Sequence, residues 1–98
     1  MTIEIKRNAE EIVLQVAGRL DTTTAPALDN AIVENINGIK SLILDLKGLE
    51  YISSAGLRVL LSAQKKMQQV GLMKVINVCD NVMEVFEITG FADILVIE

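Results

Sequence analysis

Histidine is absent from the 98-residue chain, and its absence removes several classes of enzyme. Ser-His-Asp triads, Cys-His pairs and imidazole metal sites all need the imidazole ring. A nucleophilic serine would also lack a base, and SSAG at 53–56 is not the G-x-S-x-G turn of serine hydrolases. Neither a phosphate-binding loop pattern nor a G-x-G-x-x-G pattern occurs. The sequence therefore predicts no enzyme and no site for a metal or a cofactor.

Cysteine, basic charge and long apolar runs are also scarce. Cys79 is the only cysteine, which excludes an internal disulfide and fits a reducing compartment. The net charge of −4 provides no basic footprint for nucleic acid or an acidic membrane. No apolar run approaches the roughly 18 residues that span a bilayer, and residues 1–16 lack the apolar run of a signal peptide. These features predict a soluble cytoplasmic protein with no nucleic-acid or membrane partner.

Aliphatic side chains are what the chain has in quantity. Apolar residues make up 51% of the sequence and aromatic residues 3%, so Leu, Ile and Val must fill the core. A chain of this length supports one core, which predicts a single domain over residues 1–98. The apolar spacing predicts the element order β-β-α-β-α-β-α-β. This order indicates an α/β fold in which a mixed, mostly parallel sheet packs against helices, with one antiparallel strand at its edge.

The predicted elements follow from local patterns. Strands are expected around 3–5 and at 12–18, 41–46, 72–78 and 94–98, and the run 41–46 is expected to be buried on both faces. Helices are expected from a cap among Thr22–Thr24 to about Asn37, from near Ser54 to Gly71, and from Asp80 or Asn81 to Ile88. Gly38 and Gly90 are the expected stops of the first and third helices.

The helix that begins near Ser54 has two sides of different character. When its residues are wound at about 100° each, the side predicted to face the core carries Val59, Leu60, Ala63, Met67 and Val70. The opposite side is predicted to expose Ser54, Leu57, Arg58, Leu61 and Lys65. A glycine inside a helix costs up to about 1 kcal/mol, so Gly56 favours close approach by another backbone. Two simpler explanations stay open, namely that the serines only cap the helix and that a loop covers the leucines.

Three segments of the chain resemble one known family. They are LDLKGLEYISSAGLRVLL at 44–61, GRLDTTTAPAL at 18–28 and VMEVFEITGF at 82–91. Their order and separation resemble the STAS domain family, specifically the bacterial anti-sigma factor antagonists. The resemblance covers almost the whole chain and implies the STAS-like fold. It also implies a protein that regulates transcription by partner switching, in which the unphosphorylated form binds an anti-sigma factor and frees a sigma factor.

The resemblance further implies a phosphorylation site. Ser54 is the expected acceptor, its kinase is the partner anti-sigma factor itself, and Asp21 is expected near Ser54. Many family members have Asp before the phosphorylated serine, whereas this chain has Ser53 there, which leaves Ser53 as an alternative acceptor. Asp21 is expected to cap or orient the loop rather than act as a base. The predicted partner-binding residues are Asp21, Thr22, Ser53, Ser54, Gly56, Leu57, Arg58 and Leu61.

The resemblance also implies a second partner, and one rival function stays open. A serine phosphatase that restores the unphosphorylated form is the second expected partner. The rival hypothesis is a STAS domain that is never phosphorylated and acts as a scaffold or binds a small ligand such as a nucleotide. Independence of partner binding from Ser54 would favour that rival.

Overall fold

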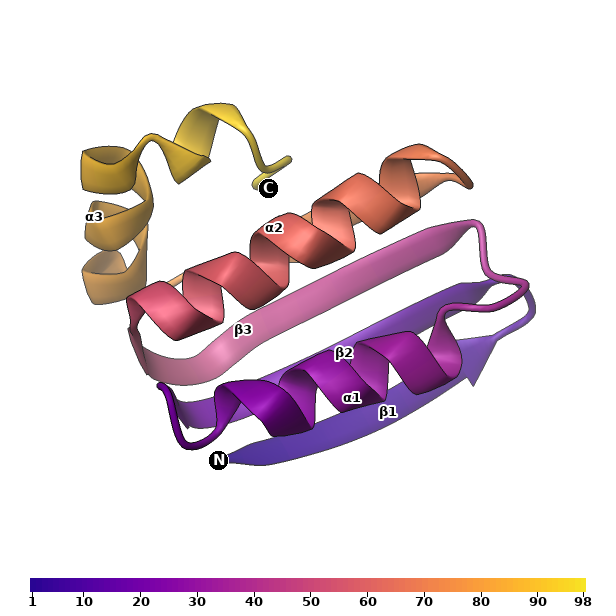
Figure 1. Ribbon diagram of the computed structural model, residues 1–98, viewed down its shortest axis with the longest axis horizontal. Coiled ribbons are helices and arrows are strands. Elements are labelled where there is room, and N and C mark those ends of the chain that lie inside the picture. Colours follow the sequence, from indigo (N-terminus) through magenta and orange to yellow (C-terminus); the bar gives the residue numbers. More distant parts are fainter.

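A four-stranded sheet carries the fold in the computed structural model, which describes residues 1–98 (Figure 1). The strand order is β1-β2-β3-β4; β1 is antiparallel to β2, and the other neighbours are parallel. The strands are β1 Thr2–Asn8, β2 Glu11–Leu20, β3 Ser41–Ile52 and β4 Leu72–Ile76. The predicted mixed sheet with an antiparallel edge strand is therefore confirmed.

Two helices cover one face of this sheet and a third packs at its end. The helices are α1 Ala25–Asn35, α2 Ser54–Gln68 and α3 Asp80–Thr89, followed by the 3₁₀ turn η1 Phe91–Asp93. α1 and α2 lie side by side over the sheet, and α3 packs against β3 (Figure 1). α3 ends at the predicted stop, because Gly90 takes the left-handed conformation with φ +82°.

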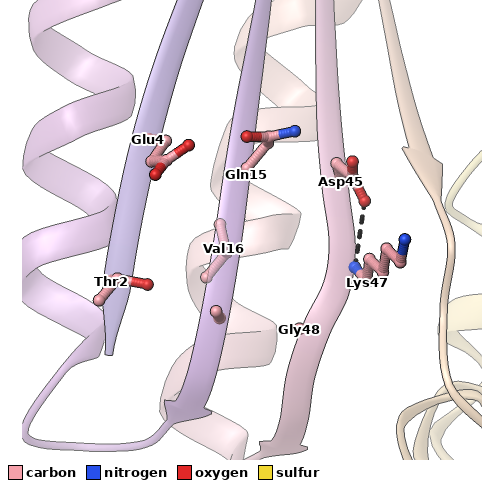
Figure 2. A pocket seen from close by; sticks show the side chains of 8 residues that line it. Thr2, Glu4, Gln15, Val16, Asp45, Lys47 and Gly48 are labelled. Atoms are coloured by element: carbon pink, nitrogen blue, oxygen red, sulfur yellow. Dashed lines mark hydrogen bonds between the residues drawn. The ribbon is translucent and has the colours of Figure 1, made fainter.

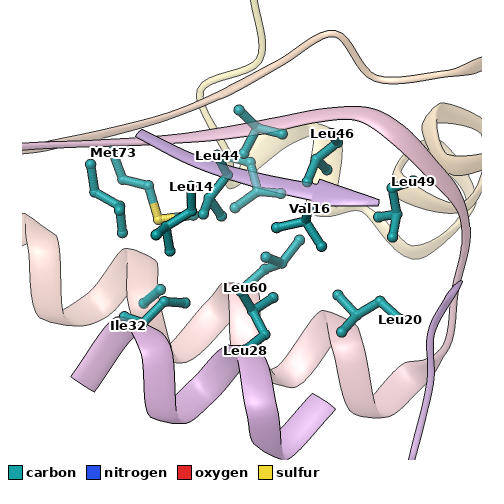
Figure 3. Close-up of a cluster of buried hydrophobic side chains, with 14 of the residues drawn as sticks. Leu14, Val16, Leu20, Leu28, Ile32, Leu44, Leu46, Leu49, Leu60 and Met73 are labelled. Atoms are coloured by element: carbon teal, nitrogen blue, oxygen red, sulfur yellow. The ribbon is translucent and has the colours of Figure 1, made fainter. Parts of the chain in front are cut away.

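The core fills the space between the sheet and α1 and α2. Leu14, Leu44 and Met73 point from the strands towards Leu28 and Leu60 on the two helices (Figure 3). All five side chains are almost completely buried. Because each crossover connection places its helix on this same side, the parallel strands stay together and their carboxyl ends meet at one edge. That edge is where α1 and α2 begin.

The prediction that residues 41–46 are buried on both faces is wrong. Leu42, Leu44 and Leu46 are buried under the helices, whereas Ile43 and Asp45 on the opposite face are only half-buried. The reason is that the main helices cover a single face of the sheet, so alternate residues of β3 meet solvent. The strand also runs six residues beyond Leu46, to Ile52.

The predicted last strand at 94–98 is reduced to one contact with the sheet. The η1 turn occupies Phe91–Asp93, and the remaining tail forms a single parallel bridge between Ile97 and Val75. The Val75 N–H donates to the Val96 carbonyl at 2.8 Å, and the Glu98 N–H donates to the Val75 carbonyl at 3.0 Å. The tail therefore follows β4 over too few residues to form a ladder.

Candidate partner-binding surface

The residues singled out around Asp21 and Ser54 come together at the carboxyl ends of β2 and β3. The Ser53 N–H donates to the Leu20 carbonyl at 2.9 Å, which ties the end of β2 to the start of α2. Asp21 directly follows Leu20, and Ser54 directly follows Ser53. The loop before α1 and the first turn of α2 thus form one continuous surface.

Asp21 organises the loop before α1. Its Oδ1 accepts hydrogen bonds from the backbone N–H groups of Thr23 at 3.0 Å and Thr24 at 3.1 Å. The Thr24 hydroxyl accepts from the Asp21 N–H at 2.9 Å and donates to the Arg19 carbonyl at 2.8 Å. The Thr24 N–H in particular holds the pKa of Asp21 below its usual value. These bonds confirm that Asp21 orients the loop, while Thr22 beside it is exposed.

The two adjacent serines have opposite environments. Ser54 is the first residue of α2 and is exposed. Ser53 is the N-cap residue with extended backbone, but its Oγ is buried and has no hydrogen-bond partner. An external enzyme can reach the Ser54 hydroxyl in this conformation, and it cannot reach the Ser53 hydroxyl.

The prediction that Leu57 faces outwards is wrong. Leu57 is only 6% exposed and belongs to the hydrophobic core. The predicted core positions Leu60, Ala63 and Met67 are buried, as expected. The buried face of α2 also includes Gly56, Leu57 and Gln64, which the predicted stripe left out. Val70, predicted to face the core, is 45% exposed, and Val59 is half-buried.

Gly56 also belongs to the interior rather than to the partner surface. A Cβ atom at this position would lie 2.7 Å from Leu20 Cγ and 2.9 Å from Ile52 Cγ1. The absence of a side chain therefore lets α2 approach the ends of β2 and β3. The close approach expected at Gly56 occurs within this chain, with side chains, and not with the backbone of a partner.

The outer face of α2 is rich in cations that have no acidic partner. Arg58 and Lys65 are exposed, as predicted, and Leu61 is half-buried between them. These residues line a shallow groove with Ser62 and Lys66. The only ion pair in the structure joins Lys74 and Glu98, so the cations of this groove are available to a binding partner.

Two residues of this edge escaped the sequence analysis. The guanidinium carbon of Arg19 lies 4.1 Å from the centre of the Tyr51 ring, and both side chains are exposed. They face each other across β2 and β3, two residues before Asp21 and Ser53 respectively. A strand prediction extended from Leu46 to Ile52 would have placed Tyr51 on the opposite face from the buried Ile52.

The largest surface hollow lies elsewhere, on the face of the sheet that the helices leave open (Figure 2). Glu4, Gln15 and Asp45 point into it from three neighbouring strands. Burial raises the pKa of Asp45, but the Asn77 side chain and the Lys47 N–H donate to its carboxylate and lower that pKa overall. None of the predicted partner-binding residues lines this hollow.

Comparison with known proteins matches this architecture to a family. A family model described as the STAS domain matches residues 2–98. The chain belongs to the STAS domain family. It is 31% identical over 96 residues to the anti-sigma-B factor antagonist of Bacillus subtilis, which covers 97% of this chain and 88% of that protein. It belongs with the anti-sigma factor antagonists of the family.

Solved structures of STAS proteins share the fold. An anti-sigma factor antagonist from Mycobacterium paratuberculosis superposes with a TM-score of 0.86 at 26% identity, over 98% of this chain and 83% of that one. The Bacillus cell fate determinant SpoIIAA in its phosphorylated form gives a TM-score of 0.78 at 18% identity, over 99% and 91% of the two chains. The helices of this STAS domain are too short or too polar to cross a membrane.

Proposed function

We propose that this anti-sigma factor antagonist binds an anti-sigma factor that is also a serine kinase, and that phosphorylation of Ser54 releases it. In this cycle the kinase transfers the γ-phosphoryl group of ATP to the Ser54 Oγ, the hydroxyl proton passes to a base of the kinase, and ADP leaves. The chain is the substrate and the binding partner, and not the enzyme. A serine phosphatase returns it to the binding form, and the whole cycle takes place in the cytoplasm.

The observation that carries the proposal is the exposed Ser54 hydroxyl at the start of α2, beside the loop that Asp21 holds. A phosphoserine carries about −1.5 to −2 charges at pH 7. At a helix N-terminus the helix dipole favours such a charge by about 0.3–1 kcal/mol. The fold of this family persists in a phosphorylated member, which agrees with a modification that the domain tolerates.

The effect of the phosphate on binding is expected to exceed its effect on folding. Burying a new, unmatched charge in a protein interface costs about 2–5 kcal/mol. This cost corresponds to a loss of affinity of roughly 30- to 5,000-fold, at tenfold per 1.4 kcal/mol. Phosphorylation therefore acts mainly on partner affinity, because the unphosphorylated surface is complementary to the partner and the phosphorylated surface repels it.

The test combines phosphopeptide mapping with binding. The protein isolated from its own cells is expected to carry phosphate on Ser54, and a kinase-like partner captured by the unmodified protein is expected to bind Ser54→Asp at least 30-fold more weakly. Ser54→Ala should bind like the unmodified protein and resist phosphorylation. Ser53→Ala is the matched control, because its Oγ is buried, and it should still be phosphorylated.

The alternatives are separated by the same samples. Phosphate on Ser53 alone would move the acceptor by one residue and require the start of α2 to open. An absence of phosphate, with partner binding unaffected by Ser54→Asp, would replace the switch with a constitutive scaffold or a small-ligand site. The burial of the Ser53 Oγ supports Ser54 as the acceptor.

A further inference from the structure

Arg58 stands one helical turn after Ser54 on the exposed side of α2. Residues four apart on a helix are neighbours, with Cβ atoms about 5–6 Å apart, and the favourable order places the negative group nearer the helix start. Both side chains are exposed, and Arg58 forms no ion pair in the unmodified protein. This spacing puts a phosphate on Ser54 within reach of the guanidinium by rotation of the side chains alone.

We propose that Arg58 is the internal counter-ion of a phosphate on Ser54, so that phosphorylation withdraws this guanidinium from the partner surface as it adds negative charge. The inference deepens the proposed function and rests on Ser54 as the modified residue. Guanidinium binds phosphate through two parallel N–H···O bonds, which suits the short link between the two residues. Phosphorylation then changes the surface in two ways: it adds negative charge at Ser54, and it engages the positive charge of Arg58.

The other cations of the surface are poorly placed for this role. Lys65 is eleven residues beyond Ser54, about 16 Å along the helix axis at 1.5 Å per residue. Arg19 is engaged over the ring of Tyr51 at 4.1 Å. Among the cations of the groove and the strand ends, Arg58 alone is both free and one turn from the acceptor.

Acidic groups share this edge and oppose the phosphate. Asp21 lies in the loop tied to the start of α2, and Asp80 begins α3, which packs on β3. The Asp21 carboxylate is held by the N–H groups of Thr23 and Thr24, so it stays charged and raises the second pKa of a nearby phosphate. Asp21 and Asp80 are present in every variant below. A difference in the phosphate pKa between the unmutated protein and an Arg58 variant therefore reports the contact of Arg58 alone.

The test needs no partner protein. Phosphoserine is installed at position 54 during translation, and the second pKa of the phosphate is measured by ³¹P NMR titration at low ionic strength. We expect Arg58→Gln to raise that pKa by about 0.2–0.4 pH unit relative to the unmutated phosphoprotein, because an i,i+4 pair contributes about 0.2–0.5 kcal/mol. The Arg58 Nε–H resonance is expected to shift on phosphorylation.

Two matched variants make the result specific. Arg58→Lys keeps the charge and should leave most of the difference in place, whereas Lys65→Gln removes a charge from the same face and should leave the pKa unchanged. Equal pKa values in the unmutated and Arg58→Gln phosphoproteins would overturn the inference. Because the phosphate is installed directly, that failure is distinct from finding no phosphate on Ser54 in cells, which would overturn the proposed function instead.

Discussion

The two faces of α2 differ in every property that matters for this protein. The inner face, with Gly56, Leu57 and Leu60, packs against the ends of β2 and β3 and is almost inaccessible to solvent. The outer face, with Ser54, Arg58 and Leu61, carries an exposed hydroxyl and cations without acidic partners. Neighbouring residues of the same helix thus divide into a set that packs in the core and a set that is open to solvent. Changes on the two faces should therefore have separable effects on stability and on binding.

The largest stability effect is expected from Leu57→Ala. Truncating a buried leucine removes its transfer free energy and leaves a cavity, so the free energy of unfolding should fall by about 2–5 kcal/mol. Leu61→Ala is the matched change on the outer face and should cost less than about 1 kcal/mol. Urea unfolding of both variants measures the difference. Equal losses would mean that the faces are not distinct.

Gly56→Ala should be the next largest change. The added Cβ would lie 2.7 Å from Leu20 Cγ, and overpacking of this kind costs about 1–3 kcal/mol. Alanine is the better helix former by up to about 1 kcal/mol, which offsets part of that cost. Ser62→Ala on the outer face is the control, with an expected change within about 0.5 kcal/mol. A more stable Gly56→Ala protein would show that Leu20 and Ile52 can move aside.

The orientation of α2 shows where sequence reasoning reached its limit. Apolar residues occur around much of the helix, so a stripe centred on Val59, Leu60 and Ala63 was as consistent with the pattern as the true one. The deciding facts are tertiary: Gly56 fits against Leu20 and Ile52, and the amide side chain of Gln64 is buried despite its polarity. Neither glycine nor glutamine counts as a hydrophobic residue, so a search for an apolar stripe leaves both out, although both lie on the buried face.

The topology was accessible because its signals are local and redundant. The role of the Asp21 loop was predictable, since a carboxylate before three threonines at a helix start has few other uses. The extra half of β3 was missed because Lys47 and Gly48 interrupt the apolar run, although the strand continues through two register shifts between β2 and β3. Tyr51 lies in that unpredicted half of β3, so its contact with Arg19 was not predicted either.

A smaller effect is expected from pH, through the carboxyl group of Asp21 in the loop before α1. The folded-state pKa of Asp21 is lowered, so its contribution to stability is present above the unfolded value of about 3.9 and is lost as pH falls through the folded value. Asp21→Asn should therefore lose less stability than the unmutated protein between pH 5 and 2, by urea midpoints across that range. Thr23→Ala retains its backbone donor and should keep the unmutated dependence. A steeper loss in Asp21→Asn would contradict the assignment.

The smallest effect should come from Ser53→Ala, and its smallness is the informative result. An N-cap serine usually contributes about 0.5–2 kcal/mol through its hydroxyl, but the Ser53 Oγ is buried and accepts no hydrogen bond. Removing an unpartnered oxygen breaks no hydrogen bond, so Ser53→Ala should cause no measurable loss in the free energy of unfolding. Thr24→Ala is the contrast, because its Oγ1 bonds the Asp21 N–H and the Arg19 carbonyl, and it should cost about 1 kcal/mol.

The same comparison bears on which serine a kinase can use. A loss above 1 kcal/mol in Ser53→Ala would mean that its hydroxyl is hydrogen-bonded in solution, and the contrast between a hidden and an exposed serine would then fail. A negligible loss would agree with a hydroxyl that neither caps the helix nor meets solvent. In that case the neighbouring Ser54, exposed at the first position of α2, is the serine that can be modified without disturbing the packed face of the helix.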